Sequence, residues 1–152
     1  MPREPFRRKR QPLPTQKQKR VATLKPGLSA SRRRVYAALE KRIGNTPLYQ
    51  VRRIPVPNGC KIFVKEEYRN PSGSHYDRVY LGLLKALETE GRIIPGKTPL
   101  IETSSGNAGI SFAWLAKKLG FSSEVIMPAN LPSARVEGAR VQGAKIRLSP
   151  AK

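Results

Sequence analysis

The sequence predicts an α/β fold: a small parallel sheet with flanking crossover helices, preceded by a disordered basic tail. Two observations lead to this prediction. From about residue 60 onward, short β-branched and apolar runs alternate with segments of helical periodicity, and the connections are short. In contrast, residues 1–42 carry fourteen Lys and Arg against two acids, which is more than half of the net charge of +20 in this 152-residue chain.

The elements follow from the periodicity of apolar residues and from the Gly and Pro residues that interrupt it. "VYAALEKRI" (35–43) predicts a short lead-in helix, and "IGNTPLYQV" (43–51) a turn followed by an apolar stub. Four strands and three helices are then predicted to alternate: strand 60–67, helix 78–90, strand 99–104, helix 107–120, strand 123–128, helix 131–144 and strand 144–149. This β-α-β order favours a parallel sheet. In helix 107–120, Phe112, Trp114 and Leu115 are predicted core residues.

The N-terminal tail is rich in Pro and basic residues and poor in large apolar ones, so residues 1–34 are predicted to be disordered. We therefore divide the chain into a tail with its lead-in, residues 1–42, and a folded part, residues 43–152. The tail is either a solvated segment or an electrostatic arm for nucleic acid, contacting it through residues 1–34.

The composition also limits the setting in which the protein acts. Cys60 is the only cysteine, so a disulfide framework within the chain is excluded and an intracellular, cytoplasmic location is favoured. No apolar run approaches the roughly 18–20 residues that span a membrane. A nicotinamide-binding unit would need a "GxGxxG" turn after a strand, and the sequence contains none.

The segment "ETSSGNAG" (102–109) is the first candidate for chemistry. A strand ends there, a polar loop follows, and a helix begins. Unpaired N–H groups at the start of a helix attract anions, the hydroxyls of Ser104 and Ser105 add donors, and Gly106 lets a ligand approach the backbone. By itself this pattern is equally typical of simple helix capping.

Five motifs occur together in a fixed order: "IGNTPL" (43–48), "VKEEYRNPSGSHYDR" (64–78), "GRIIPGKTPLIETSSGNAGIS" (91–111), "VIMPANLPSAR" (125–135) and "GAKIRL" (143–148). In this order and spacing they resemble the fold-type II pyridoxal-phosphate (PLP) enzymes, and the cysteine synthase and cystathionine β-synthase branch most closely. The resemblance covers residues 43–152. It implies a lyase or transferase that performs β-elimination or β-replacement on serine-like amino acids, with PLP as cofactor and an amino acid as substrate, and it is compatible with a homodimer.

The resemblance also implies roles for individual residues. Ser104, Ser105, Gly106, Asn107 and Ala108 match the loop that binds the carboxylate of the substrate. Asn107 in addition matches the asparagine that hydrogen-bonds the ring hydroxyl of PLP. Residues 70–78 match "NPSGSxKDR", whose lysine forms the imine with PLP.

Tyr76 occupies the position of that lysine. A phenol cannot form an imine, which requires a primary amine, so we predict that this chain does not catalyse the family reaction. Lys65 and Lys85 are the nearest amines in the sequence, and both are expected to be solvated charges. His75, the only histidine, precedes Tyr76 at a position that the motif leaves variable, and we expect a structural or incidental role for it.

The matched region is about half of a family catalytic core, because the resemblance places the Gly-rich phosphate loop beyond "RLSPAK" (147–152). Three interpretations stay open: the N-terminal part of a PLP enzyme with an unusual tyrosine, a short pseudoenzyme that binds a ligand or a partner, and a nucleic-acid-binding protein that acts through its basic tail.

Overall fold

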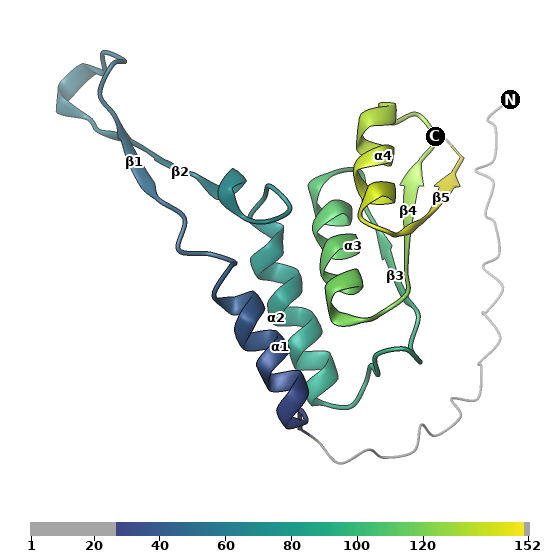
Figure 1. Cartoon of the computed structure of the whole chain (residues 1–152). Helices are drawn as coiled ribbons and strands as arrows, with labels where there is room; N and C mark the ends of the chain where they lie inside the picture. The colour runs from purple at the N-terminus through teal and green to yellow at the C-terminus, as the bar shows by residue number, and fades with distance from the viewer. Residues whose placement is uncertain (1–26, 151–152) are drawn as a thin grey trace, which may run out of the picture.

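The computed structural model describes residues 27–150 (Figure 1). Its helices are α1 (Ala30–Glu40), α2 (Tyr76–Thr89), α3 (Asn107–Leu119) and α4 (Ser133–Val141). Its strands are β1 (Leu48–Val51), β2 (Ile62–Lys65), β3 (Leu100–Thr103), β4 (Ser123–Pro128) and β5 (Lys145–Ser149). The predictions for residues 1–26, disorder and a nucleic-acid-binding arm, lie outside the described residues.

A three-stranded parallel sheet in the order β3–β4–β5 forms the C-terminal half, which confirms the predicted fold class. Leu100 of β3 pairs with Ser123 of β4, and Glu124 of β4 pairs with Lys145 of β5. The crossover helices α3 and α4 connect these strands (Figure 1). Because the strands are parallel, the loops that lead into α3 and α4 both leave the carboxyl edge of the sheet.

The strand predicted at 60–67 does not join this sheet, so the prediction of a fourth parallel strand was wrong. β2 pairs antiparallel with β1 in a hairpin that projects from the rest of the chain (Figure 1). Asn58 and Gly59 both adopt positive φ, at 59° and 69°, within the connection between the two strands. The chain therefore reverses there, and β2 finds its hydrogen-bond partner in β1 rather than in β3.

The lead-in helix begins earlier than predicted, so the prediction of disorder was wrong for residues 30–34. The Ser29 side chain accepts a hydrogen bond from the Arg32 N–H and caps α1. Arg32 also donates two hydrogen bonds to the Glu88 carboxylate on α2, at 2.5 and 2.7 Å, and the Tyr36 hydroxyl donates to the same carboxylate at 2.8 Å. This ion pair spans 56 residues of sequence and leaves no local signature.

Helix α3 lies at the centre of the core and contacts α2, α4 and the sheet. Its residues Phe112, Trp114 and Leu115 are buried, as predicted. Gly120, with φ of 80°, ends the helix in the left-handed conformation that glycine adopts without strain. Between residues 27 and 150, no helix is both long and apolar enough to cross a lipid bilayer.

Candidate functional site

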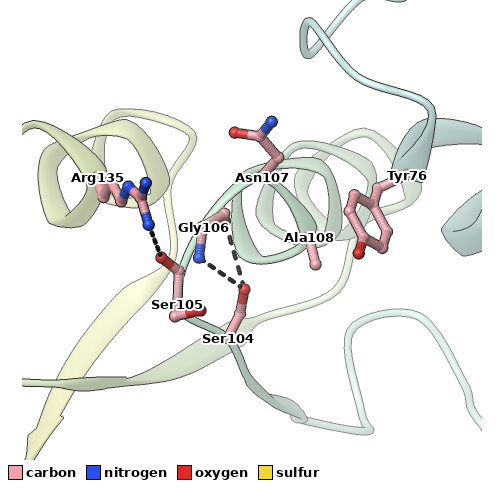
Figure 2. A pocket seen from close by; sticks show the side chains of 7 residues that line it. All are labelled: Tyr76, Ser104, Ser105, Gly106, Asn107, Ala108 and Arg135. Carbon is pink, nitrogen blue, oxygen red and sulfur yellow. Dashed lines mark hydrogen bonds between the residues drawn. The ribbon is translucent and has the colours of Figure 1, made fainter. Parts of the chain in front are cut away.

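A cavity of about 300 Å³ lies at the carboxyl edge of the sheet, where β3 leads into α3 (Figure 2). The cavity lining includes the residue at the lysine position of the family motif and all five residues of the predicted substrate loop: Tyr76, Ser104, Ser105, Gly106, Asn107 and Ala108. Arg135 of α4 completes the lining. Residues from two motifs, 28 or more positions apart in the sequence, therefore share one site.

The loop from Ser104 to Ala108 is held by its own hydrogen bonds. The Ser104 Oγ accepts from the N–H groups of Gly106 at 3.2 Å and Gly109 at 2.8 Å, and the Ser104 N–H donates to the carbonyl oxygen of Ile126 on β4 at 3.0 Å. The Ser104 hydroxyl thus serves as a cap for α3 in this structure. Its predicted contact with substrate stays a prediction.

The N–H groups of Asn107 and Ala108, the first two residues of α3, have no acceptor among residues 27–150. Unpaired N–H groups at a helix start carry partial positive charge. An anion in the cavity could accept hydrogen bonds from both groups, and a carboxylate has the two oxygens to do so. This is the chemistry that the sequence predicted for the loop.

The turn that carries Tyr76 is fixed by a cluster of small polar side chains. The buried Asp77 carboxylate accepts hydrogen bonds from both the N–H group and the hydroxyl of Ser72. The Ser111 hydroxyl on α3 lies 2.6 Å from that of Ser72 and 3.2 Å from that of Ser74. Ser74 in turn accepts from the Tyr76 N–H at 3.1 Å. The cluster joins the turn to α3, so the backbone of residue 76 has a defined place beside the loop.

A second polar cluster connects the base of the hairpin with α2. The Glu67 carboxylate accepts hydrogen bonds from Arg78 at 2.8 and 3.0 Å, from Thr46 at 2.6 Å and from Asn70 at 2.7 Å. The Arg78 guanidinium, followed by the Thr46 hydroxyl, lowers the pKa of Glu67 from 4.5 to about 2. The Asn70 amide oxygen also accepts from the Gly44 N–H at 2.8 Å. The motif residues Asn70 and Arg78 thus act as structural supports.

Tyr76 is partly buried and lines one side of the cavity, across the loop from Arg135 (Figure 2). The ring of His75 lies 4.3 Å from the Tyr76 ring, centroid to centroid, at an interplanar angle of 32°. His75 itself is exposed and is not part of the cavity lining. The structural or incidental role expected for His75 stays a prediction.

Arg135 is the residue of this site that the sequence analysis missed. It lies in the first turn of α4, and its Nη1 donates to the carbonyl oxygen of Ser105 at 3.2 Å (Figure 2). The signal was present, since Arg135 closely follows β4 and β4 neighbours β3 in a parallel sheet. The loops after neighbouring parallel strands meet at the same edge.

The residues of the cavity do not fit PLP held as an imine. None of its lining residues is a lysine, and the phenol of Tyr76 cannot replace an amine. Lys65 donates to the backbone carbonyl of Thr46, and Lys85 forms an ion pair with Glu40 at 2.6 Å, so both amines are engaged elsewhere. The unpaired N–H groups of the loop fit a carboxylate.

Comparisons with known proteins show the family and agree with the fold. A family model described as "Pyridoxal-phosphate dependent enzyme" matches residues 39–152. Cysteine synthase B of Salmonella typhimurium is 43% identical over 97 residues, which are 64% of this chain and 32% of that protein.

Two solved structures show the same similarity. A hydrogen sulfide-producing enzyme of Fusobacterium nucleatum superposes with a TM-score of 0.71 at 33% identity, covering 78% of this chain and 35% of that one. A lysine-to-alanine mutant of O-ureido-L-serine synthase, with O-ureido-L-serine bound, superposes with a TM-score of 0.68 at 32% identity. The match covers 74% of this chain and 34% of that one. The chain thus spans about a third of the length of these relatives. The family model covers residues 39–152 and the fold agrees over the matched span, so the chain belongs to the family of pyridoxal-phosphate-dependent enzymes.

Proposed function

We propose that this chain supplies the amino-acid-binding part of a cysteine synthase-like site, and that the 152-residue chain binds a serine-like amino acid without performing β-elimination or β-replacement. The observation that carries the proposal is the composition of the cavity. It combines the loop of residues 104–108 with Tyr76 at the position where the family pattern has its lysine, and among residues 27–150 no lysine lines it.

The binding half of the proposal rests on the loop. The N–H groups of Asn107 and Ala108 supply two donors to a carboxylate, and the hydroxyl of Ser105 is exposed on the same loop. Gly106 has no side chain to fill the space between them. The loop donors are held by bonds to Ser104 and do not depend on the residue at position 76.

The relatives support binding of a serine derivative in the absence of a lysine. The O-ureido-L-serine synthase mutant has lost one lysine to alanine and still holds O-ureido-L-serine. In that relative, recognition of the amino acid survives the loss of this lysine. We expect this chain, with tyrosine in its cavity, to bind a serine-like amino acid as well, because the loop binds the carboxylate.

The catalytic half of the proposal rests on Tyr76. PLP supplies an electron sink for an amino-acid carbanion when it is bound to an enzyme. Here the phenol of Tyr76 does not offer the amine that tethers the cofactor. Tyr76 therefore forms a wall of the cavity and leaves the amino acid unreacted.

Binding is tested by isothermal titration calorimetry of the 152-residue protein with L-serine. We expect saturable binding, and D-serine, which presents its hydroxymethyl group on the opposite side, should bind more weakly. Gly106→Ala is the site variant. A Cβ at position 106 would lie 4.0 Å from Arg135 Nη1, so the variant should fold normally, but the methyl group narrows the cavity and should weaken binding. Gly82→Ala on α2, where a Cβ meets nothing within 4 Å, is the matched control.

Catalysis is tested in two steps. Cysteine formation from O-acetyl-L-serine and sulfide by the purified protein would refute the second half of the proposal. Borohydride reduction in the presence of PLP, followed by peptide mapping, should show stronger labelling at position 76 in Tyr76→Lys than at position 79 in Val79→Lys. The latter places an amine on the exposed face of the same helix, because Val79 is 51% exposed. Equal labelling of the two variants would show that the cavity does not favour an imine at position 76.

A further inference from the structure

Arg135 lines the cavity from the side opposite Tyr76, with the loop of residues 104–108 between them (Figure 2). Among residues 27–150, it is the one charged side chain in the lining. From its position and its hydrogen bonding, we propose that Arg135 makes the site selective for amino acids whose side chain carries a second negative group, such as a phosphate ester or a carboxylate. This inference rests on the proposed function, because it names the substrate class of the same site.

The charge of Arg135 is not neutralised by the part of the chain that the structure describes. Within residues 27–150 no carboxylate oxygen lies within 4 Å of its guanidinium, whereas Arg140 on the same helix pairs with Glu137 at 2.6 Å. Its single hydrogen bond there goes from Nη1 to the Ser105 carbonyl oxygen. A guanidinium has five N–H donors in a planar fork, so donors remain for a ligand, and the fork suits phosphate and carboxylate.

Two distinct anion-binding places follow from this arrangement. The N–H groups of Asn107 and Ala108 lie at the start of α3, and Arg135 lies in the first turn of α4. A serine-like ligand whose α-carboxylate occupies the first place has its side chain free to reach the second. Gly106 lies between the two places, and its missing side chain leaves the approach to Arg135 Nη1 open.

A purely supporting role for Arg135 has a different consequence. If Arg135 served only to hold the loop through its hydrogen bond to Ser105, the loss of that bond would weaken the binding of every amino acid by the same factor. A selective role weakens only ligands with a second negative group. The ratio of the affinity for a ligand with a second negative group to the affinity for L-serine therefore distinguishes a selective Arg135 from a supporting one. The affinity for one ligand alone does not.

The experiment is calorimetry of the full chain, at constant ionic strength, with L-serine, O-phospho-L-serine and inorganic phosphate. Wild type should bind O-phospho-L-serine about fivefold more tightly than L-serine, which corresponds to about 1 kcal/mol, the upper end of the range for an exposed ion pair. Arg135→Gln should remove this preference and leave L-serine affinity within about twofold. Arg140→Gln makes the same change of charge on the same helix outside the cavity lining and should keep the preference.

Three results would overturn the inference: equal affinities of wild type for the two amino acids, an Arg135→Gln variant that loses both affinities by the same factor, or inorganic phosphate that binds as tightly as O-phospho-L-serine. If neither amino acid binds wild type, the proposed function itself fails. Unchanged melting temperatures of both variants would show that the comparison concerns folded protein.

Discussion

A pair of glycine-to-alanine substitutions tests the packing of the loop against the sheet. Gly109 lies in the first turn of α3, and a Cβ there would meet Ser104 Cβ and Val125 Cγ1, both at 3.0 Å. Neither neighbour can easily move, because the Ser104 N–H is bonded to β4 and Val125 is fully buried in that strand. At Gly82 in α2, a Cβ would meet nothing within 4 Å.

Both substitutions gain the same helix propensity, about 1 kcal/mol. Only Gly109→Ala also introduces overpacking, which costs about 1–3 kcal/mol. We therefore expect Gly82→Ala to stabilise the protein by about 1 kcal/mol and Gly109→Ala to leave it between unchanged and about 2 kcal/mol less stable. Because the propensity gain is common to both variants, the difference between them measures the overpacking alone.

Urea unfolding followed by circular dichroism gives the two free energies of unfolding, and thermal unfolding gives an independent check. The melting temperatures of the two variants should differ by roughly 4 °C for each kcal/mol. If Gly109→Ala stabilises the protein as much as Gly82→Ala does, the loop is not packed against β4 as described. In that case the fixed geometry of the Ser104 to Ala108 loop, on which the proposed binding depends, would have to be abandoned.

Two further predictions concern the polar clusters. Tyr36→Phe removes the hydroxyl that donates to Glu88 and leaves the ion pair between Glu88 and Arg32 in place. The variant should therefore lower the free energy of unfolding, measured in urea, by about 1.5 kcal/mol. An unchanged free energy of unfolding would show that this hydrogen bond does not stabilise the fold. The pKa of Glu67 is lowered in the folded state from 4.5 to about 2 by Arg78, so its contribution to stability is complete above pH 4.5 and is lost as the pH falls toward 2. The stability difference between wild type and Glu67→Gln should therefore shrink over this range, and a difference that does not change with pH would contradict the assignment.

The fold of the C-terminal half could be predicted from sequence because its determinants are local. Strand β4 coincides with the apolar run at 123–128, and α3 begins and ends within a residue of its predicted limits, since its apolar periodicity stops at Gly120. The loop of the site could be predicted for the same reason, because a polar Ser-Ser-Gly-Asn segment separates a strand from a helix.

The errors arose where the determining contact is distant in sequence. The helical state of residues 30–34 depends on the pairing of Arg32 with Glu88, which a local pattern cannot show. The hairpin did have a local signal, the Asn58–Gly59 pair at its turn, but the ten residues between β1 and β2 obscured it. Arg135 was missed because its role depends on β4 lying next to β3 in the sheet, and the sequence pattern predicted a parallel sheet without the spatial order of its strands.

The identity of residue 76 is separable from the fold of the turn that holds it. The bonds that fix this turn come from Ser72, Ser74, Asp77 and Ser111, and residue 76 takes part only through its backbone N–H. The Tyr76 side chain packs against the core and lies beside the His75 ring, but none of these hydrogen bonds requires a tyrosine at position 76. It follows that the family architecture can persist around a side chain that cannot form an imine. In the proposed function, residue 76 therefore sets the chemistry, while its polar neighbours and the loop set the geometry.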